Sequence, residues 1–178
     1  MAIHFNGVFQ QDVTASRWDI FYLKMAHQVS SMSKDPSTQT GAVIVRPNKS
    51  VVSVGFNGFP KDMPDNPEWY ANREEKYSRI VHCEMNALLF TKEPVNGYTL
   101  FTWPFASCDR CCVSMLQGGI TRFVFPELPE HLKERWQKPL DLTKKYIAEC
   151  KHEWLEISLK EIYPPYGHAP VPYDPEKQ

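Results

Sequence analysis

Apolar side chains recur at helical spacing near the start of the chain. Ser16 is a plausible N-cap, and the apolar positions after it continue to about Met32, before Asp35-Pro36-Ser37 stops the pattern. Two β-branched runs follow, Gly41–Val45 and Val51–Phe56, and a polar turn joins them. The pattern therefore predicts one helix and then a β-hairpin.

Helical and strand patterns alternate through the rest of the chain. Residues 61–78 are polar and contain prolines, which predicts a loop. Further helices are predicted at His82–Phe90, Asp109–Gln117 and about Pro129–Ala148, and further strands at Tyr98–Thr102, Arg122–Phe125 and Glu153–Ile157. This order predicts a single-domain α/β fold with a five-stranded mixed sheet, covered by helices on both faces and with crossovers in its second half.

Both ends of the chain differ from this central unit. We expect residues 1–15 to form an N-terminal arm, residues 16–160 the folded domain and residues 161–178 a proline-rich tail. Five prolines between positions 164 and 175 exclude a long helix there. Two alternatives are open for the tail. It is either a disordered or surface-bound end, or an arm that lies across a neighbouring subunit through apolar anchors such as Tyr163 and Tyr173.

Composition narrows the class of protein. The 178 residues carry a formal net charge of −1, and no run of Lys and Arg exceeds two residues, so a strongly basic face for a nucleic-acid backbone is not evident. No apolar stretch approaches the roughly 18 residues that span a bilayer. Five cysteines, an odd number, fit a reducing compartment. We expect a protein of the cytoplasm, or of the host cytoplasm for a viral source, that binds neither nucleic acid nor membrane.

Two short motifs supply the chemistry. His82-Cys83-Glu84 and Cys108-Asp109-Arg110-Cys111 offer three zinc ligands, His82, Cys108 and Cys111, and one carboxylate. Structural zinc sites use four protein ligands, whereas catalytic sites use three and leave a position for water. Zinc lowers the pKa of a bound water to about 7. Glu84, two residues after the histidine, reaches that water without being a ligand, and we predict that it carries protons.

The third ligand has an alternative. Cys112 also lies on the same helical face as Cys108. We favour Cys111, because the two-residue spacing brings both sulfurs to the first turn of a helix, whereas Cys112 should point into the core. The order His-x-Glu, proline, Cys-x-x-Cys is the signature of zinc-dependent base deaminases. Here residues 105–107 separate Pro104 from the first cysteine, so the loop is longer than usual.

The chain resembles the deoxycytidylate (dCMP) deaminases of the cytidine and deoxycytidylate zinc deaminase family over roughly residues 16–126. The runs that carry the resemblance are 33–45, 55–60, 82–87 and the cysteine pair followed by Gly119-Ile120. The resemblance implies a cytidine-deaminase-like fold and the hydrolysis of dCMP to dUMP, a step towards thymidylate. It also implies a homohexamer that dCTP activates and dTTP inhibits, each bound with Mg²⁺.

The resemblance also suggests residues that bind the substrate. Asn57 would contact the sugar of the nucleotide or lie between the active and regulatory sites. Ser33 and Lys34 would face the phosphate, since they combine a hydroxyl donor with a point charge. Lys76 and Arg79 are alternatives for the phosphate.

A regulatory nucleotide site is expected in the run 55–60. Gly55 and Gly58 would expose backbone groups there, and the Asn57 amide would offer both a donor and an acceptor to a base or sugar. A triphosphate bound at this run would be the regulator that the resemblance implies.

Two departures from the family, and two rival functions, remain. Members commonly have a tyrosine just after the strand that ends at Phe125, and none stands there, so Trp136 or Trp103 would supply the aromatic surface. Residues 61–81 contain no Cys or His for an additional zinc, so we expect one Zn²⁺ per subunit.

The alternative functions are a deaminase of cytidine, deoxycytidine or single-stranded nucleic acid, and a non-catalytic zinc module closed by a fourth ligand.

Overall fold

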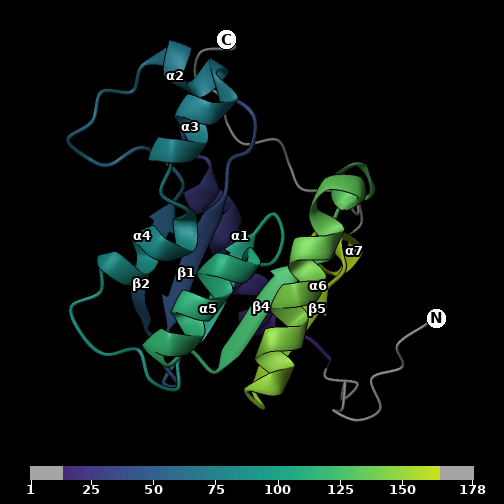
Figure 1. Ribbon diagram of the computed structural model, residues 1–178. Helices are drawn as coiled ribbons and strands as arrows, with labels where there is room; N and C mark the ends of the chain where they lie inside the picture. Colours follow the sequence, from purple (N-terminus) through teal and green to yellow (C-terminus); the bar gives the residue numbers. More distant parts are fainter. Residues whose placement is uncertain (1–13, 165–178) are drawn as a thin grey trace.

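The computed structural model describes residues 14–164 (Figure 1). The strands are β1 (Gly41–Val45), β2 (Val51–Phe56), β3 (Thr99–Trp103), β4 (Arg122–Pro126) and β5 (Glu153–Ile157). The helices are α1 (Arg17–Ser30), α2 (Pro67–Ala71), α3 (Arg73–Arg79), α4 (Cys83–Leu89), α5 (Asp109–Gly118), α6 (Lys133–Glu149) and α7 (Leu159–Ile162), and a 3-10 turn, η1 (Glu130–Leu132), precedes α6. In this described part, none of the helices combines the length and the apolar character that crossing a bilayer requires.

The five strands form one mixed sheet in the order β2-β1-β3-β4-β5. β1 runs antiparallel to both β2 and β3, while β3, β4 and β5 are parallel. Parallel neighbours need crossover connections, and α5 and α6 provide them. The predicted five-stranded α/β architecture, including the hairpin and the crossovers in the second half, is confirmed.

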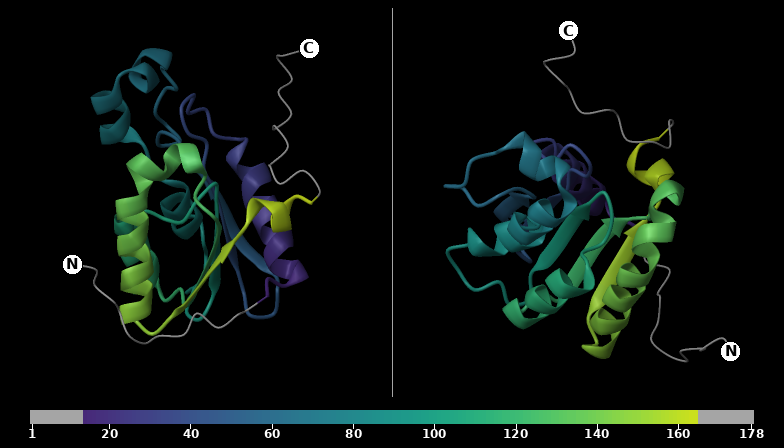
Figure 2. Two further views of the ribbon diagram at one scale, coloured as in Figure 1. Left: turned by 90° about the vertical axis from the view of Figure 1, so that its right-hand side faces the viewer. Right: turned by 45° about the horizontal axis from the view of Figure 1, so that its top comes forward.

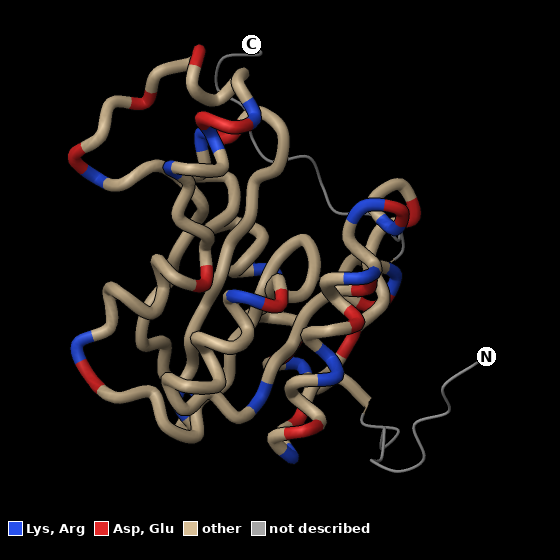
Figure 3. Tube along the Cα trace, viewed as in Figure 1, with Lys and Arg blue, Asp and Glu red and all other residues tan. Residues whose placement is uncertain are grey.

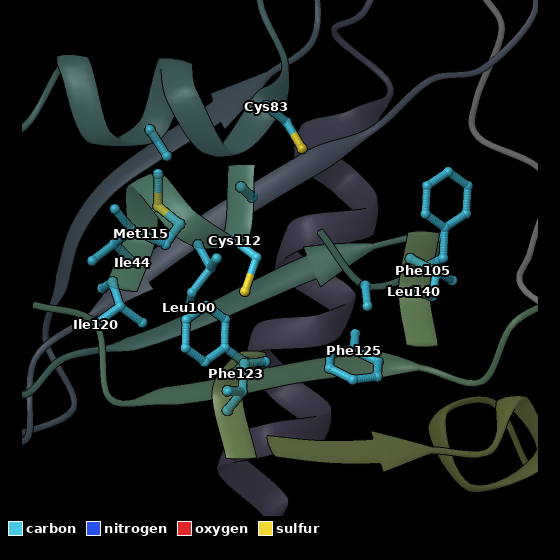
Figure 4. Close-up of a cluster of buried hydrophobic side chains, with 14 of the residues drawn as sticks. Ile44, Cys83, Leu100, Phe105, Cys112, Met115, Ile120, Phe123, Phe125 and Leu140 are labelled. Atoms are coloured by element: carbon cyan, nitrogen blue, oxygen red, sulfur yellow. The ribbon is translucent and has the colours of Figure 1, made fainter. Parts of the chain in front are cut away.

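Helices cover both faces of the sheet (Figure 2). Because side chains alternate along a strand, Ala42 and Ile44 of β1 belong to the buried cluster that includes residues of α4, α5 and α6, while Val43 and Val45 belong to the cluster that includes residues of α1 and α7. Figure 4 shows the first of these clusters, in which Leu100 and the phenylalanines of β4 meet residues of α5. Each such fully buried side chain contributes roughly 1.5–3 kcal/mol.

The first helix begins as the sequence predicts. The Ser16 side chain accepts a hydrogen bond from the Asp19 backbone N–H at 3.2 Å, and the Asp19 carboxylate accepts one from the Ser16 N–H at 3.0 Å. Arg122 on β4 also donates to Asp19 at 2.7 Å. This arrangement fixes the start of α1 against one end of the sheet.

The loop predicted over residues 61–78 is wrong in part, because the structure has two short helices there, α2 and α3. Asn66 caps α2, which has Pro67 at its first position, and Asn72 caps α3 through its side-chain oxygen. These signals are in the sequence, but the helices have only 5 and 7 residues and lack an apolar repeat that would reveal them. In Figure 1 they lie beyond one end of the sheet.

The chain ends are only partly described. Residues 161–164 of the expected tail are ordered in the fold, since α7 extends to Ile162, which is buried. Tyr163 packs within the same chain, where its hydroxyl lies 2.6 Å from Nδ1 of His27. Tyr173 and most of the expected N-terminal arm lie outside the described residues.

Candidate metal centre and adjoining cavity

Two helix N-termini bring the predicted ligands together. His82 is the N-cap of α4 and makes no capping hydrogen bond, so its imidazole is free to bind a ligand. Cys108 is the N-cap of α5, and Cys111 lies in the first turn of that helix. α4 and α5 pack against each other, which places these two starts side by side.

The spacing of the three ligand atoms fits a zinc ion. His82 Nδ1 lies 3.6 Å from Cys108 Sγ and 3.4 Å from Cys111 Sγ. All three ligand atoms lie within 4.8 Å of one another. A tetrahedral zinc with bonds of about 2.0 Å to nitrogen and 2.3 Å to sulfur separates such atoms by about 3.6 Å. The donor set of one imidazole and two thiols also matches the preference of zinc.

The two thiols differ in acidity. A hydrogen bond from the Cys111 thiol, together with the nearby His82, lowers the pKa of Cys108 to about 4. Donating that hydrogen bond, and burial, raise the pKa of Cys111. The hydrogen bond between His82 and Cys108 also raises the pKa of His82. The lowered pKa favours the thiolate form of Cys108, which is the form that binds a metal ion, and metal binding would displace the remaining protons.

Cys112 points away from this centre. Its side chain is fully buried, and its Sγ lies 3.9 Å from the Thr143 carbonyl oxygen of α6. Figure 4 shows it within the apolar cluster, near Met115 and Leu100. Burial raises its pKa to about 12. The geometry thus groups Cys111, and not Cys112, with His82 and Cys108.

Glu84 lies beside the metal centre without joining the ligand group. It is in the first turn of α4, is 5% exposed, and lines a cavity that also reaches His82 and Cys108. The neighbouring Cys83 thiol donates to Glu84 Oε2 at 3.2 Å. A buried carboxylate at this place can exchange protons with a molecule bound in the cavity.

The cavity is open to solvent, and the space inside it, open mouth included, is about 600 Å³. Its wall combines the start of α4, the loop before α5, the segment before β1, and parts of α3 and α6. The lining residues are Asp35, Thr38, Thr40, Asn57, Lys76, Tyr77, Ile80, His82, Cys83, Glu84, Trp103, Phe105, Ala106, Cys108, Arg135 and Trp136.

Asn57 lines the cavity, but its amide is used inside the protein. Oδ1 accepts from the Thr40 N–H at 2.8 Å, and Nδ2 donates to the Thr38 carbonyl at 2.9 Å and to Asp35 at 3.4 Å. Both amide hydrogens therefore have partners. The side chain holds the segment that forms one wall of the cavity, and only the remaining acceptor capacity of Oδ1 is left for a ligand.

The two glycines expected at a regulatory nucleotide site have different surroundings. A Cβ on Gly55 would lie 2.3 Å from both the Ala87 N and the Cys83 carbonyl oxygen of α4. Gly55 therefore faces α4 and allows that helix to approach β2 closely, so the expectation that it exposes backbone groups to a nucleotide is corrected. A Cβ on Gly58 would meet no atom within 4 Å, so this position is open.

The structure also corrects the expectation that Ser33 and Lys34 face a phosphate. Ser33 is 3% exposed, and its hydroxyl donates to the Asn57 carbonyl at 2.8 Å. The Lys34 side chain points to solvent and pairs with Asp65 at 2.6 Å. Neither residue lines the cavity. Of the two alternatives, Lys76 lines it, whereas Arg79 does not and bonds instead with Glu75 of its own helix.

Both candidate tryptophans reach the cavity. Trp103 comes from the end of β3, and Trp136 from α6, where it stacks on Phe105 with ring centroids 5.1 Å apart. Either tryptophan can therefore supply the aromatic surface that was expected in place of a tyrosine after Phe125. The sequence did not point to Tyr77 or Arg135, because neither lies in a recognisable motif.

The fold and the metal centre together define a zinc-binding deaminase domain. The chain belongs to the cytidine and deoxycytidylate deaminase zinc-binding family, whose family model matches residues 16–127.

Known relatives agree with this assignment. An uncharacterized deaminase of Aliivibrio fischeri is 36% identical over 146 residues, which cover 81% of this chain and 97% of the relative. The deoxycytidylate deaminase of Mus musculus is 31% identical over 163 residues, covering 88% and 86%. The fold is also similar to the apo crystal structure of dCMP deaminase from cyanophage S-TIM5, with a TM-score of 0.61 at 20% identity, covering 81% of this chain and 100% of that one.

Proposed function

We propose that this chain catalyses the hydrolytic deamination of dCMP to dUMP, with one Zn²⁺ held by His82, Cys108 and Cys111. One observation carries the proposal: two members of a three-ligand centre, His82 and Cys108, line the same cavity as a buried carboxylate outside that centre, Glu84. The Mus musculus relative is a deoxycytidylate deaminase, and a cyanophage relative of similar fold has been solved with dCMP and dUMP. These relatives support a nucleotide as the substrate.

The residues of the chain divide the chemistry as follows. A zinc ion at the three ligands would supply a water that is activated at neutral pH. Glu84 takes one proton from the attacking water and passes it to the ring nitrogen. After the oxygen has bonded to the ring, Glu84 takes its second proton and delivers it to the leaving amino group. Water adds at the amine-bearing carbon of the ring, ammonia departs and a carbonyl remains. General acid–base help of this kind contributes about 10²- to 10⁴-fold.

The shape of the cavity supports a small substrate. Phe105, Trp103 and Trp136 provide flat apolar surfaces against which a pyrimidine can stack. A closed zinc module is disfavoured, because in the described part of the chain the group of metal-binding side chains has three members. A deaminase of cytidine, deoxycytidine or single-stranded DNA is the rival function.

The test is to assay the zinc-loaded protein on dCMP, deoxycytidine, cytidine and single-stranded DNA side by side, following ammonia release and the loss of the cytosine absorbance. We expect dCMP to have the highest kcat/KM. Turnover of the nucleosides or the DNA, with dCMP inert, would refute the proposal. Zinc binding without turnover of any cytosine compound would favour the closed module.

Regulation and assembly are further parts of this proposal, and they rest on the resemblance to the deoxycytidylate deaminases. They are a homohexamer, activation by dCTP and inhibition by dTTP, each with Mg²⁺, and a role in supplying dUMP for thymidylate. Asn57 and the open position at Gly58 remain candidates for the nucleotide contact. Activity that does not respond to millimolar dCTP or dTTP with Mg²⁺ would refute the regulation but not the deamination.

A further inference from the structure

Two cationic side chains line the cavity, Lys76 and Arg135. Figure 3 shows basic and acidic residues interspersed over the chain, so each charge has to be judged by its own partners. Lys76 Nζ lies 3.1 Å from Asp35 Oδ1 and also donates to the Ser37 hydroxyl. The side chains of Lys76 and Asp35 are only 10% and 4% exposed. The charge of Lys76 is therefore largely balanced inside the protein before any ligand binds.

Arg135 is different. Within residues 14–164, no carboxylate lies within 4.0 Å of its guanidinium nitrogens. Its Nη2 donates to the hydroxyl of Tyr77, a neutral group, and its Cζ lies 5.0 Å from the ring centroid of Trp136. A guanidinium has five N–H donors, so most of them remain available. Among the described residues, Arg135 thus brings a positive charge without a carboxylate partner to the cavity wall.

The arrangement also holds this charge in place. Tyr77 comes from α3 and Arg135 from α6, and both residues line the cavity. The hydrogen bond and the stacking on Trp136 restrict the long arginine side chain on two sides. A restrained guanidinium loses less side-chain entropy when a ligand binds, and its planar fork matches two oxygens of a phosphate.

We propose that Arg135, positioned by Tyr77, binds the phosphate of the nucleotide and determines the preference for a nucleoside monophosphate over the free nucleoside. This inference rests on the proposed function and names the residue that recognises the charged part of its substrate. It assigns the phosphate contact to α6, which lies outside the residues that match the family model. Arg135 thus takes the place of Ser33 and Lys34 as the proposed phosphate contact.

Binding of the product and its nucleoside tests the proposal without requiring turnover. Calorimetry would compare dUMP with deoxyuridine on the zinc-loaded wild type, Arg135→Gln and Lys138→Gln. Lys138 is a matched control, because it is an exposed cation on the same helix that does not line the cavity. We expect Arg135→Gln to weaken dUMP about 10- to 100-fold, the factor expected for losing a hydrogen bond to a charged group. Deoxyuridine affinity should stay unchanged, and Lys138→Gln should behave as wild type.

Two further variants separate charge from geometry. Arg135→Lys keeps the charge but loses the fork, so it should recover only part of the dUMP affinity. Tyr77→Phe removes the hydroxyl that holds the guanidinium, and should weaken dUMP by a smaller factor than Arg135→Gln.

The inference is overturned if Arg135→Gln binds dUMP as well as the wild type, if it weakens dUMP and deoxyuridine equally, or if the wild type does not prefer dUMP. These outcomes are separate from the failure of the proposed function. A wild type that binds dUMP through Arg135 but does not deaminate dCMP would leave the phosphate site standing and refute the deaminase activity.

Discussion

Replacing Gly55 by alanine should damage the metal centre, although Gly55 is not a ligand. The added Cβ would lie 2.3 Å from two backbone atoms of α4, the Ala87 N and the Cys83 carbonyl oxygen. Ordinary contacts of this kind are 3.4 Å or longer, so α4 or β2 has to move by about 1 Å. Backbone atoms cannot rotate away as a flexible side chain can. Overpacking of this kind costs about 1–3 kcal/mol.

The same displacement acts on the chemistry. α4 carries Glu84 in its first turn, and His82 caps the helix. A misplacement of about 1 Å can reduce a catalytic rate about 10²-fold. For a chain of this length, 1–3 kcal/mol lowers Tm by roughly 2–12 °C. We therefore expect Gly55→Ala to show a lower Tm and a much lower kcat on dCMP.

Gly58→Ala is the matched control, since a Cβ there meets nothing within 4 Å and the backbone is not in the left-handed region. Thermal unfolding, zinc content and dCMP turnover would be measured on both variants and the wild type. Gly58→Ala should keep its Tm within about 2 °C of the wild type and retain turnover. Wild-type stability and turnover in Gly55→Ala, or equal damage from both substitutions, would refute the packing argument.

Three other predictions follow from the site. Glu84→Gln should abolish dCMP turnover while zinc content stays near one per chain; loss of the metal would identify Glu84 as a ligand. Cys111→Ser should lose zinc, whereas Cys112→Ser should keep it at a packing cost of about 1 kcal/mol, and the opposite pattern in a metal analysis would reverse the assignment. Burial raises the pKa of Asp35, but hydrogen bonds from Ser37 and Lys76 outweigh it and lower the pKa overall. The stability that the ionised Asp35 contributes is therefore present above the unfolded pKa of about 3.9 and is lost as the pH falls through the lower folded pKa. Asp35→Asn should lower the free energy of unfolding by roughly 3 kcal/mol at pH 7 and by less at pH 3, measured by urea unfolding. The same difference between wild type and variant at both pH values would contradict this.

The sequence by itself determined the features that depend on short-range spacing. Two β-branched runs joined by a polar turn predict the hairpin strands Gly41–Val45 and Val51–Phe56, and the structure confirms these bounds. The spacing of Cys108 and Cys111 at a helix start sets their sulfurs on one turn, whatever surrounds that helix. The position of Glu84 follows in the same way from His82. The local sequence determines these relative positions, because each of them involves residues only a few positions apart.

Only the tertiary structure decided which distant residues share the cavity. Gly55 in a glycine-rich run suggests a ligand loop, yet its surroundings are the backbone of α4. Lys34 suggests a phosphate contact, yet its side chain leaves the cavity and pairs with Asp65. Arg135 meets Tyr77 across 58 positions of sequence. The packing of α3 and α6 around the cavity sets such contacts, and no local pattern of residues records them.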